Sequence, residues 1–260
     1  MSITDEGHYG PKQLNLLKVV WGEGFLSPGG TKEIDEIVEG VNVSGKSILD
    51  IGCGCGGAAI HLIKKHGAKK VIGIDIEPLV IKKANELANK QDLSNFTDFR
   101  IAQSDTFDLP DQSVNIVFSK EVFLHFLNKE NLLKEIYRIL KPNGMLLVSD
   151  WMRIDDNPPS KQMQEYIAAE GLDMHMCSLK RYEQLLHKVG FINIVIKDRN
   201  AWYLDKAKNE LAAIEGPLKQ QVIDVIGLDE TNGAIEIWKK LIGVLKTGEH
   251  RPGHFKAFKK

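Results

Sequence analysis

The chain has 260 residues, of which 43% are hydrophobic and 27% are charged, and its formal net charge is −1. This length is sufficient for a large buried core, and the composition is typical of a soluble globular protein. Because 34 basic residues balance 35 acidic ones, the charge does not favour nucleic-acid or membrane-surface partners. No apolar run approaches the roughly 20 residues of a membrane-spanning helix, and the polar start MSITDEGHYG is not a signal peptide.

Residues 1–45 precede the most regular part of the chain. They suggest helical turns followed by the loop FLSPGG, which is marked by one Pro and two Gly. From about residue 46 to residue 197, apolar runs alternate with amphipathic stretches. This alternation predicts an α/β fold with a doubly wound, mostly parallel sheet and helices on both faces.

The predicted strands are short apolar runs between polar or turn-forming residues. They span residues 47–51, 70–75, 99–103, 114–119, 145–150 and 192–197. Apolar residues at helical spacing predict helices in AAIHLIKKHG, PLVIKKANELANK and KENLLKEIYRILKPNG. The last of these ends in a Pro and a Gly, as helix stops often do.

Two stretches, at about residues 151–190 and 205–247, interrupt or extend this alternation. Additions to an open sheet tend to cover the crevice at the carboxyl ends of its strands, where ligands bind. We therefore expect residues 46–260 to form one domain in which these two stretches are helical lid insertions over a substrate.

A burst of glycines, Gly52, Gly54, Gly56 and Gly57, follows the first predicted strand. Glycines at this point let the backbone turn sharply and approach a ligand where a Cβ would collide. A tight turn without any ligand is one alternative. A nicotinamide-dependent dehydrogenase is another, although the acid-first sequence DIGCGCG suits a pyrophosphate-binding helix N-terminus less well.

Three acids follow one another at the ends of predicted strands. Asp50 precedes the first glycine, and Asp75 ends the second strand, where a carboxylate can accept both hydroxyls of a ribose. Asp105 follows the third strand, within reach of an adenine amino group. This succession over residues 46–197 resembles the class I S-adenosylmethionine-dependent methyltransferases.

The resemblance implies a Rossmann-like methyltransferase fold with S-adenosyl-L-methionine as the cofactor. The glycine loop is implied to pass the methionine portion of the cofactor, Asp75 to hold the ribose, and Asp105 to touch the adenine. The residues that the resemblance assigns to the cofactor are Leu26, Ser27, Asp50, Gly52, Gly54, Asp75, Ile76, Asp105, Thr106 and Lys120.

The flanking segments narrow this resemblance. HYGPKQLNLLKVVWGEGFLSPGG, SKEVFLHF and RPGHFKAFK look like the phosphoethanolamine N-methyltransferase group, and the methyltransferase domain of ovothiol biosynthesis shares a similar N-terminal segment. By this match, residues 1–45 form a helical cap over the cofactor, and Tyr9 and His125 assist proton loss from the acceptor. Glu121 stands where the group has an Asp. Leu26 and Ser27 flank the cofactor's carboxylate end, and Lys120 stands near the adenine.

The implied chemistry accounts for the catalytic pair. Transfer of a methyl group to an amine requires a free lone pair on nitrogen, whereas an alkylammonium has a pKa near ~10. A histidine with a pKa near ~6.5 can accept or relay that proton. A tyrosine hydroxyl can orient the histidine or close the site. Without the resemblance, His125 after an apolar run also fits a packed side chain.

The lid sequence QMQEYIAAEGLDMHM departs from the phosphoethanolamine group. Tyr166 matches one of the group's phosphate-binding tyrosines, but Glu170 stands at its Arg and Leu172 at another Tyr. A carboxylate in place of an Arg reverses the charge preference, so Glu170 favours a cationic or zwitterionic acceptor. The residues assigned to the substrate are Glu121, Trp151, Tyr166 and Glu170.

Other residues leave alternatives open at the acceptor. A phosphate could instead meet Arg181, Lys240 or Arg251. Trp151, Trp202 and Tyr203 could offer aromatic faces to an alkylammonium, but core packing explains them equally well.

The three cysteines, Cys53, Cys55 and Cys177, form no disulfide framework and predict a reducing, cytoplasmic location. A structural zinc site needs about four ligands. Because no second cysteine pair accompanies Cys53 and Cys55, we expect packing residues here and no metal site.

The sequence therefore predicts an N-methyltransferase for a small polar amine, phosphoethanolamine-like or glycine/sarcosine/dimethylglycine-like. Its partners would be the cofactor and a small-molecule acceptor, and the oligomeric state is left open. The alternatives are a methyltransferase for an oxygen, carbon or ring-nitrogen acceptor, and a catalytically silent cofactor-binding protein.

Overall fold

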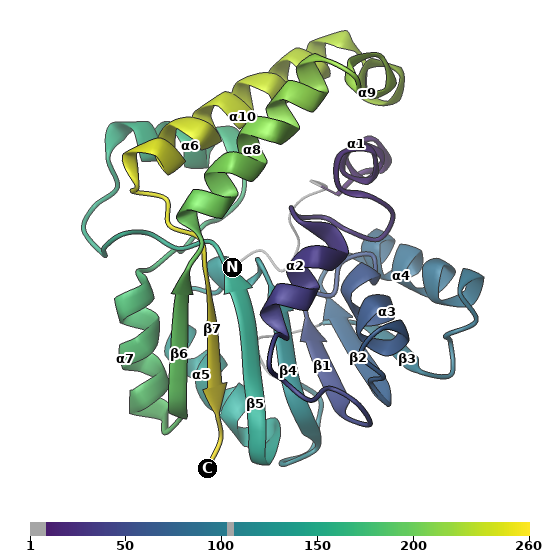
Figure 1. Cartoon of the computed structure of the whole chain (residues 1–260), viewed down its shortest axis with the longest axis vertical. Helices are drawn as coiled ribbons and strands as arrows, with labels where there is room; N and C mark the ends of the chain where they lie inside the picture. Colours follow the sequence, from purple (N-terminus) through teal and green to yellow (C-terminus); the bar gives the residue numbers. More distant parts are fainter. Residues whose placement is uncertain (1–8, 103–106) are drawn as a thin grey trace.

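The computed structural model describes residues 9–102 and 107–260. Across these residues the chain forms a seven-stranded sheet in the order β3-β2-β1-β4-β5-β7-β6, with helices on both faces (Figure 1). The strands are β1 (Ser47–Ile51), β2 (Lys70–Asp75), β3 (Thr97–Ile101), β4 (Val114–Lys120), β5 (Leu140–Asp150), β6 (Ile192–Asp198) and β7 (Gly253–Phe258). β7 is antiparallel to β5 and β6, whereas the other neighbours are parallel. The predicted doubly wound, mostly parallel α/β fold is confirmed, and β7 distinguishes it from the 3-2-1-4-5-6 order of dinucleotide-binding folds.

The strand bounds agree with the sequence predictions at β1 and β2 and differ most at β3 and β5. β3 begins and ends two residues earlier than predicted. β5 begins at Leu140, so KPNG, expected to end a helix, belongs to the strand. The physical cause is pairing with the end of the chain: the Asn143 amide donates to the Lys259 carbonyl (3.1 Å), and the Lys259 amide donates to the Gly144 carbonyl (2.9 Å).

The sequence does not predict β7, because a His and a Lys interrupt its apolar pattern. In the fold this strand lies between β5 and β6, where His254 is buried. His254 tolerates burial because its Nε2 lies 2.6 Å from a carboxylate oxygen of Glu33. Arg199 donates to the other oxygen of Glu33 at 2.7 Å. A buried charge network thus replaces the apolar side chain expected in a central strand.

Separate apolar cores cover the two faces of the sheet. The helices on one face are α2 (Gly30–Ile37), α3 (Gly57–Lys64) and α4 (Pro78–Lys90). Those on the other face are α5 (Lys129–Ile139) and α7 (Leu179–Val189). Although α7 falls within the stretch 151–190 expected to be a lid, it packs against α5 and β6 and belongs to the sheet layers.

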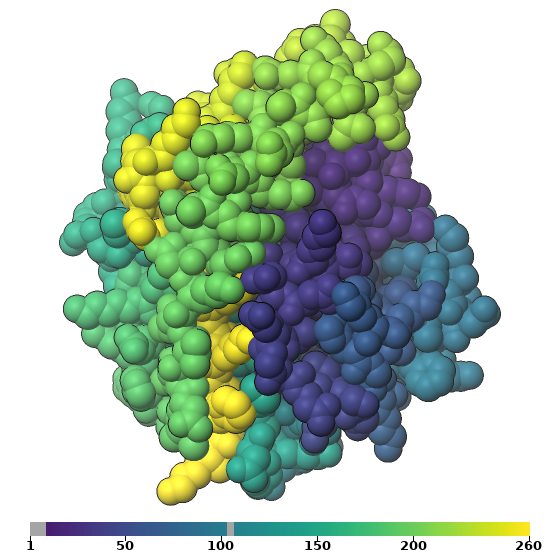
Figure 2. All heavy atoms as spheres, viewed as in Figure 1, coloured from purple at the N-terminus to yellow at the C-terminus, as the bar shows by residue number. Residues whose placement is uncertain are grey.

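Four further helices form a helical lid over the carboxyl ends of the parallel strands (Figure 1). The lid comprises α6 (Lys161–Glu170), α8 (Asn200–Glu215), α9 (Lys219–Ile226) and α10 (Leu228–Thr247). The N-terminal helix α1 (Pro11–Trp21) packs against α9, as the contact between the purple and green surfaces in Figure 2 shows. The indole N–H groups of Trp21 and Trp238 both donate to the buried Glu210 carboxylate, at 2.8 and 3.2 Å.

The lid helices α8, α9 and α10 lie in the sequence between β6 and β7, two strands that are neighbours in the sheet. Asp198 pairs with Gly253, and the Arg199 amide donates to the Pro252 carbonyl at 2.8 Å. The chain therefore leaves the sheet and returns to it at adjacent points. None of the described helices combines the length and apolarity needed to cross a membrane.

Candidate active site

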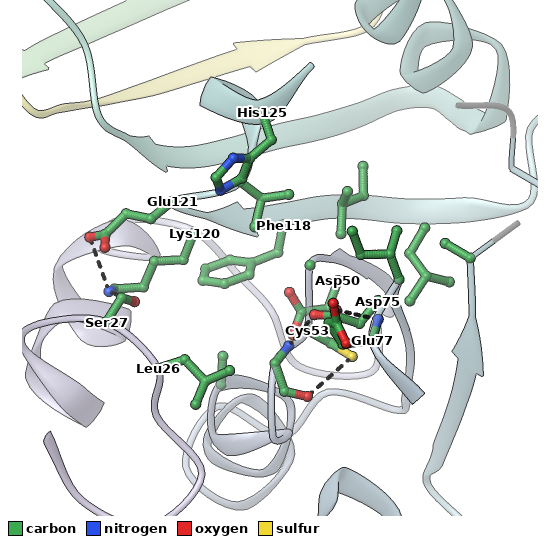
Figure 3. Close-up of a pocket in the computed structure, with 18 of the residues that line it drawn as sticks. Leu26, Ser27, Asp50, Cys53, Asp75, Glu77, Phe118, Lys120, Glu121 and His125 are labelled. Carbon is green, nitrogen blue, oxygen red and sulfur yellow. Dashed lines mark hydrogen bonds and ion pairs between the residues drawn. The ribbon is translucent and has the colours of Figure 1, made fainter. Parts of the chain in front are cut away.

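A pocket lies at the carboxyl ends of β1, β2 and β4 (Figure 3). The sequence-predicted residues that line it are Tyr9, Leu26, Ser27, Asp50, Gly52, Gly54, Asp75, Ile76, Lys120, Glu121 and His125. Trp151, Tyr166 and Glu170 do not line it, and Asp105 and Thr106 lie outside the described residues. The fold thus assembles most of the predicted cofactor residues around one pocket together with both predicted catalytic residues.

Steric contacts explain why glycines occupy the loop after β1. Gly52 has φ +68°, and a Cβ there would lie 2.0 Å from a Val122 methyl carbon. Gly54 has φ +53°, and its Cβ would lie 3.2 Å from the Leu26 side chain. Both positions need the left-handed backbone that glycine adopts without strain. The glycines therefore let the segments after β1 and β4 and the N-terminal loop approach one another around the pocket.

Asp75 is held in place by backbone donors on both carboxylate oxygens. The Gly54 amide donates to Oδ2 at 3.0 Å, and the Glu77 amide donates to Oδ1 at 3.2 Å. Burial raises the pKa of Asp75 to about 6. Because each carboxylate oxygen can accept two hydrogen bonds, each keeps capacity for a ligand hydroxyl. The sequence analysis did not select Glu77, which also lines the pocket.

Asp50 lies beside Asp75 in the pocket wall and is fully buried (Figure 3). Among the described residues, no donor reaches its Oδ2. Burial, and to a smaller extent the nearby Asp75 carboxylate, raises the pKa of Asp50 to about 8. A buried carboxylate oxygen without a partner is costly. The position therefore calls for a cation or a hydrogen-bond donor from a ligand.

This burial makes stability depend on pH. Between the ordinary value of 3.8 and about 8, the folded protein holds a proton on Asp50 that the unfolded chain has released. The free energy of unfolding therefore falls as pH rises through that window. We expect Asp50→Asn to reduce this fall, so its melting temperature relative to wild type increases from pH 5 to pH 8 in scanning fluorimetry. The exposed-site control Asp92→Asn should show the same dependence of melting temperature on pH as the wild type. If Asp50→Asn also shows the wild-type dependence, the raised pKa does not belong to Asp50.

A chain of polar side chains closes the other end of the pocket. Lys120 donates to the Ser27 hydroxyl and, at 3.2 Å, to a carboxylate oxygen of Glu121. Tyr203 from the lid donates to the same oxygen of Glu121. Because Lys120 touches Ser27, the two lie at one end of the pocket, on the far side from Asp75 in Figure 3. The implied positions, Ser27 at the cofactor's carboxylate end and Lys120 near the adenine, are therefore not compatible.

Glu121 itself has an unusual backbone. Its φ is +59°, in the left-handed region that non-glycine residues seldom occupy. Its amide donates to the Ser149 carbonyl at 2.7 Å, and its Oε2 is buried without a hydrogen-bond partner within the described chain. Such strain tends to occur at functional sites, where the surrounding structure enforces it. Here it directs a carboxylate between the pocket and the lid.

His125 lies on a short 3-10 turn, Phe123–His125, just after β4. Its ring Nδ1 is 2.9 Å from the carbonyl oxygen of Asp173, which follows α6. Because a carbonyl can only accept, Nδ1 carries the proton, and Nε2 is the basic atom of the neutral ring. The ring extends into the pocket in Figure 3, and Tyr9 also lines the pocket. Both predicted catalytic residues thus lie at the same pocket.

Trp151, Tyr166 and His250 form an aromatic cluster where α6 meets the end of β5; Tyr166 and His250 are buried, and Trp151 is partly buried. Their ring centroids are 5.3–6.2 Å apart. Trp151 Nε1, the Tyr166 hydroxyl and His250 Nε2 are buried without hydrogen-bond partners in the described structure. His250 Nδ1 lies 3.2 Å from the Met152 carbonyl, so Nε2 is its acceptor atom. Burial lowers the pKa of His250 to about 4, which keeps the ring neutral.

Glu170, at the end of α6, lies next to this aromatic cluster. Its carboxyl is near the Tyr166 hydroxyl, although the two do not reach standard hydrogen-bond geometry. Burial raises the pKa of Glu170 to about 7. Other predicted candidates are engaged elsewhere: the Arg199 guanidinium stacks on Trp202 at 4.6 Å, and Arg251 pairs with Asp198 at 2.6 Å.

Comparisons with known proteins agree with the fold. Residues 42–169 match a family described as a methyltransferase domain. The chain is 32% identical over 241 residues to phosphoethanolamine N-methyltransferase 1 of Arabidopsis thaliana, covering 92% of this chain and 48% of that protein. It is 26% identical over 263 residues to phosphoethanolamine N-methyltransferase of Plasmodium falciparum, covering 98% and 92%. The chain spans about half the length of the curated plant relatives that it matches.

Solved structures show the same architecture. Phosphoethanolamine N-methyltransferase 2 of Haemonchus contortus, in complex with phosphomonomethylethanolamine and S-adenosylhomocysteine, aligns with a TM-score of 0.90 at 24% identity, covering 99% of this chain and 60% of that one. A putative sarcosine dimethylglycine methyltransferase from Galdieria sulphuraria aligns with a TM-score of 0.82 at 20% identity, covering 98% of each. Residues 42–169 of the chain thus match a methyltransferase domain, and the chain as a whole resembles the phosphoethanolamine N-methyltransferase group.

Proposed function

We propose that this chain is an S-adenosylmethionine-dependent N-methyltransferase for a small polar amine, phosphoethanolamine-like or glycine/sarcosine/dimethylglycine-like. One observation carries the proposal. A pocket at the carboxyl ends of the strands brings the basic ring of His125 together with the acids Asp50 and Asp75. A cofactor site and a proton acceptor therefore share one pocket.

The pocket residues fit this cofactor. Both oxygens of Asp75 keep capacity to accept from the hydroxyls of a ribose. The unpartnered Oδ2 of Asp50 suits the cofactor's ammonium group. A bound cation beside Asp50 would also favour its ionised form. When bound, the cofactor supplies an electrophilic methyl group on a sulfonium.

His125 would take the acceptor's proton. An alkylammonium with a pKa near ~10 is almost entirely protonated at neutral pH, so it has no lone pair until a base removes a proton. Nε2 of His125 is that base, and the Asp173 carbonyl at 2.9 Å from Nδ1 stabilises the resulting imidazolium. Tyr9 lines the same pocket and would orient the ring or close the site.

Aromatic rings and carboxyl groups close to α6 favour a cationic or zwitterionic acceptor. The rings of Trp151 and Tyr166 offer π faces that attract alkylammonium groups. Neutral His250 offers an acceptor nitrogen, and Glu121 and Glu170 contribute carboxyls. None of these five side chains carries positive charge at neutral pH, whereas a phosphate is bound best by charged donors. These five side chains therefore favour the glycine/sarcosine/dimethylglycine-like acceptors of the proposal over the phosphoethanolamine-like ones.

Glu170→Arg tests this preference. We expect the KM of a zwitterionic acceptor such as dimethylglycine to rise about tenfold, equivalent to about 1.4 kcal/mol, because attraction of its ammonium group is replaced by repulsion. Affinity for S-adenosylhomocysteine, measured by calorimetry, should not change. Glu165→Arg on the exposed side of α6 is the matched control. If phosphoethanolamine is the best substrate of the wild-type protein, the argument from Glu170 is wrong.

A panel of amines assayed for S-adenosylhomocysteine production tests the proposed function. Turnover with primary to tertiary amines supports it. Turnover only with hydroxyl, carbon or ring-nitrogen acceptors would favour another methyltransferase class. Cofactor binding without turnover on any acceptor would indicate a silent cofactor-binding protein.

We also propose a cytoplasmic location. All three cysteines are free thiols: Cys53 and Cys55 are buried, and Cys177 is partly buried. Thiols persist in a reducing compartment.

A further inference from the structure

Asp35, His61 and His66 form a cluster outside the pocket, where α2 packs against α3. Nε2 of each histidine lies 2.8 Å from the same oxygen, Oδ1 of Asp35. The two imidazole rings are nearly perpendicular, with centroids 5.5 Å apart. The side chains are 14%, 21% and 30% exposed for His61, His66 and Asp35. The cluster is therefore preassembled and still accessible to a small ion.

The donor set is that of a transition-metal site. One carboxylate oxygen and two imidazole nitrogens all lie within 4.8 Å of one another. Three protein ligands of this kind, with a water in the fourth position, satisfy Zn²⁺ and related ions.

We propose that Asp35, His61 and His66 bind a divalent transition-metal ion, with Zn²⁺ as the reference case. The ion would replace the two hydrogen bonds to Asp35 with coordination bonds. Because Nε2 now donates its proton to Asp35, each ring would give up that proton and hold one on Nδ1, so that the freed Nε2 lone pair can ligate the ion. The sequence analysis considered only cysteines for metal binding, because the three ligands are 26 and 31 residues apart and meet only through helix packing.

The place of the cluster suggests what the ion would do. α2 begins just after the loop that carries Leu26 and Ser27, and α3 begins just after the glycine loop. Both loops line the pocket. An ion bound between the two helices would therefore stabilise the positions of the two loops that line the pocket.

Lys65 provides a sharp test of coordination. Its ammonium lies 2.7 Å from Oδ2 of Asp35 and would repel a dication on Oδ1. Since the Lys65 side chain is 57% exposed, Lys65→Gln removes this charge without opening the core. Metal binding should become several-fold tighter in this variant. A purely hydrogen-bonded cluster gives no such gain.

The experiment is calorimetric titration of the full chain with Zn²⁺, accompanied by thermal melts. We expect about one equivalent to bind the wild type and to raise its melting temperature by about 5 °C at 100 times the Kd. His61→Gln, His66→Gln and Asp35→Asn should each weaken binding at least tenfold. Each melt is compared with the same variant without metal, because these variants also lose hydrogen bonds to Asp35. Mg²⁺, which prefers oxygen ligands, should give no shift.

The control is His187→Gln, which changes an exposed histidine at the end of α7. It should bind Zn²⁺ as the wild type does. The proposal is wrong if the wild type binds no more Zn²⁺ than the three ligand variants. It is equally wrong if His187→Gln loses as much affinity as His66→Gln.

Discussion

His125→Ala is expected to lower turnover by about 10²–10⁴-fold, the usual contribution of acid–base catalysis. The physical reason is that the acceptor ammonium would lose the base that frees its lone pair. Affinity for S-adenosylhomocysteine should barely change, because the ring acts on the acceptor. The measurement is S-adenosylhomocysteine production with the best acceptor from the amine panel, and His187→Ala, at an exposed site, is the control.

The pH profile separates a base from a packing residue. If His125 takes the proton, the wild-type rate rises with pH through an ionisation near neutrality, and this limb disappears or moves in His125→Ala. Tyr9→Phe should cause a smaller loss. The double variant should lose less than the two single losses combined if both residues act as a unit. Near-normal turnover of His125→Ala on the true acceptor would show that His125 is a packing residue and not the base.

Asp75→Ala is expected to weaken binding of S-adenosylhomocysteine by about 10- to 100-fold. The estimate corresponds to about 1.5–3 kcal/mol for a hydrogen bond to a charged group. The loss includes indirect effects, because Asp75 also fixes the Gly54 and Glu77 amides. Calorimetry gives the affinity directly, and Asp92→Ala, at an exposed site after α4, is the control.

Two further measurements sharpen this prediction. Asp75→Asn keeps the shape and one acceptor oxygen, so its loss should be intermediate. Because the pKa of Asp75 is raised to about 6, wild-type affinity should also decline as pH falls below about 6, where the carboxyl becomes protonated. Unchanged affinity for S-adenosylhomocysteine in Asp75→Ala would show that Asp75 does not bind the ribose.

The sequence was informative where structure depends on local pattern. β1 and β2 are short, mostly apolar segments, and both were predicted with their observed bounds. β7 could not be predicted, because His254 is acceptable in a central strand only beside Glu33, which lies more than 200 residues away. The extension of β5 likewise depends on pairing with Lys259. Long-range partners decide both cases.

The same distinction applies to the site. The glycines and acids of the pocket were predictable because they follow strands whose carboxyl ends meet at one edge, and the family resemblance supplied Tyr9 and His125. His250 carried no signal, because only the fold brings it to Trp151 and Tyr166. Three of the residues assigned to the substrate, Trp151, Tyr166 and Glu170, do not line the pocket.

The position of the lid helices between β6 and β7 bears on how long this connection can be. In topological terms, α8–α10 are an oversized hairpin loop of about fifty residues. Loop-closure entropy grows only with the logarithm of length, about 0.6 kcal/mol per doubling, so expanding a short turn to this size costs roughly 2 kcal/mol. Contacts such as those of Glu210 with Trp21 and Trp238 can offset that cost. The sheet can therefore carry a loop of very different length at this point while the strand order stays intact.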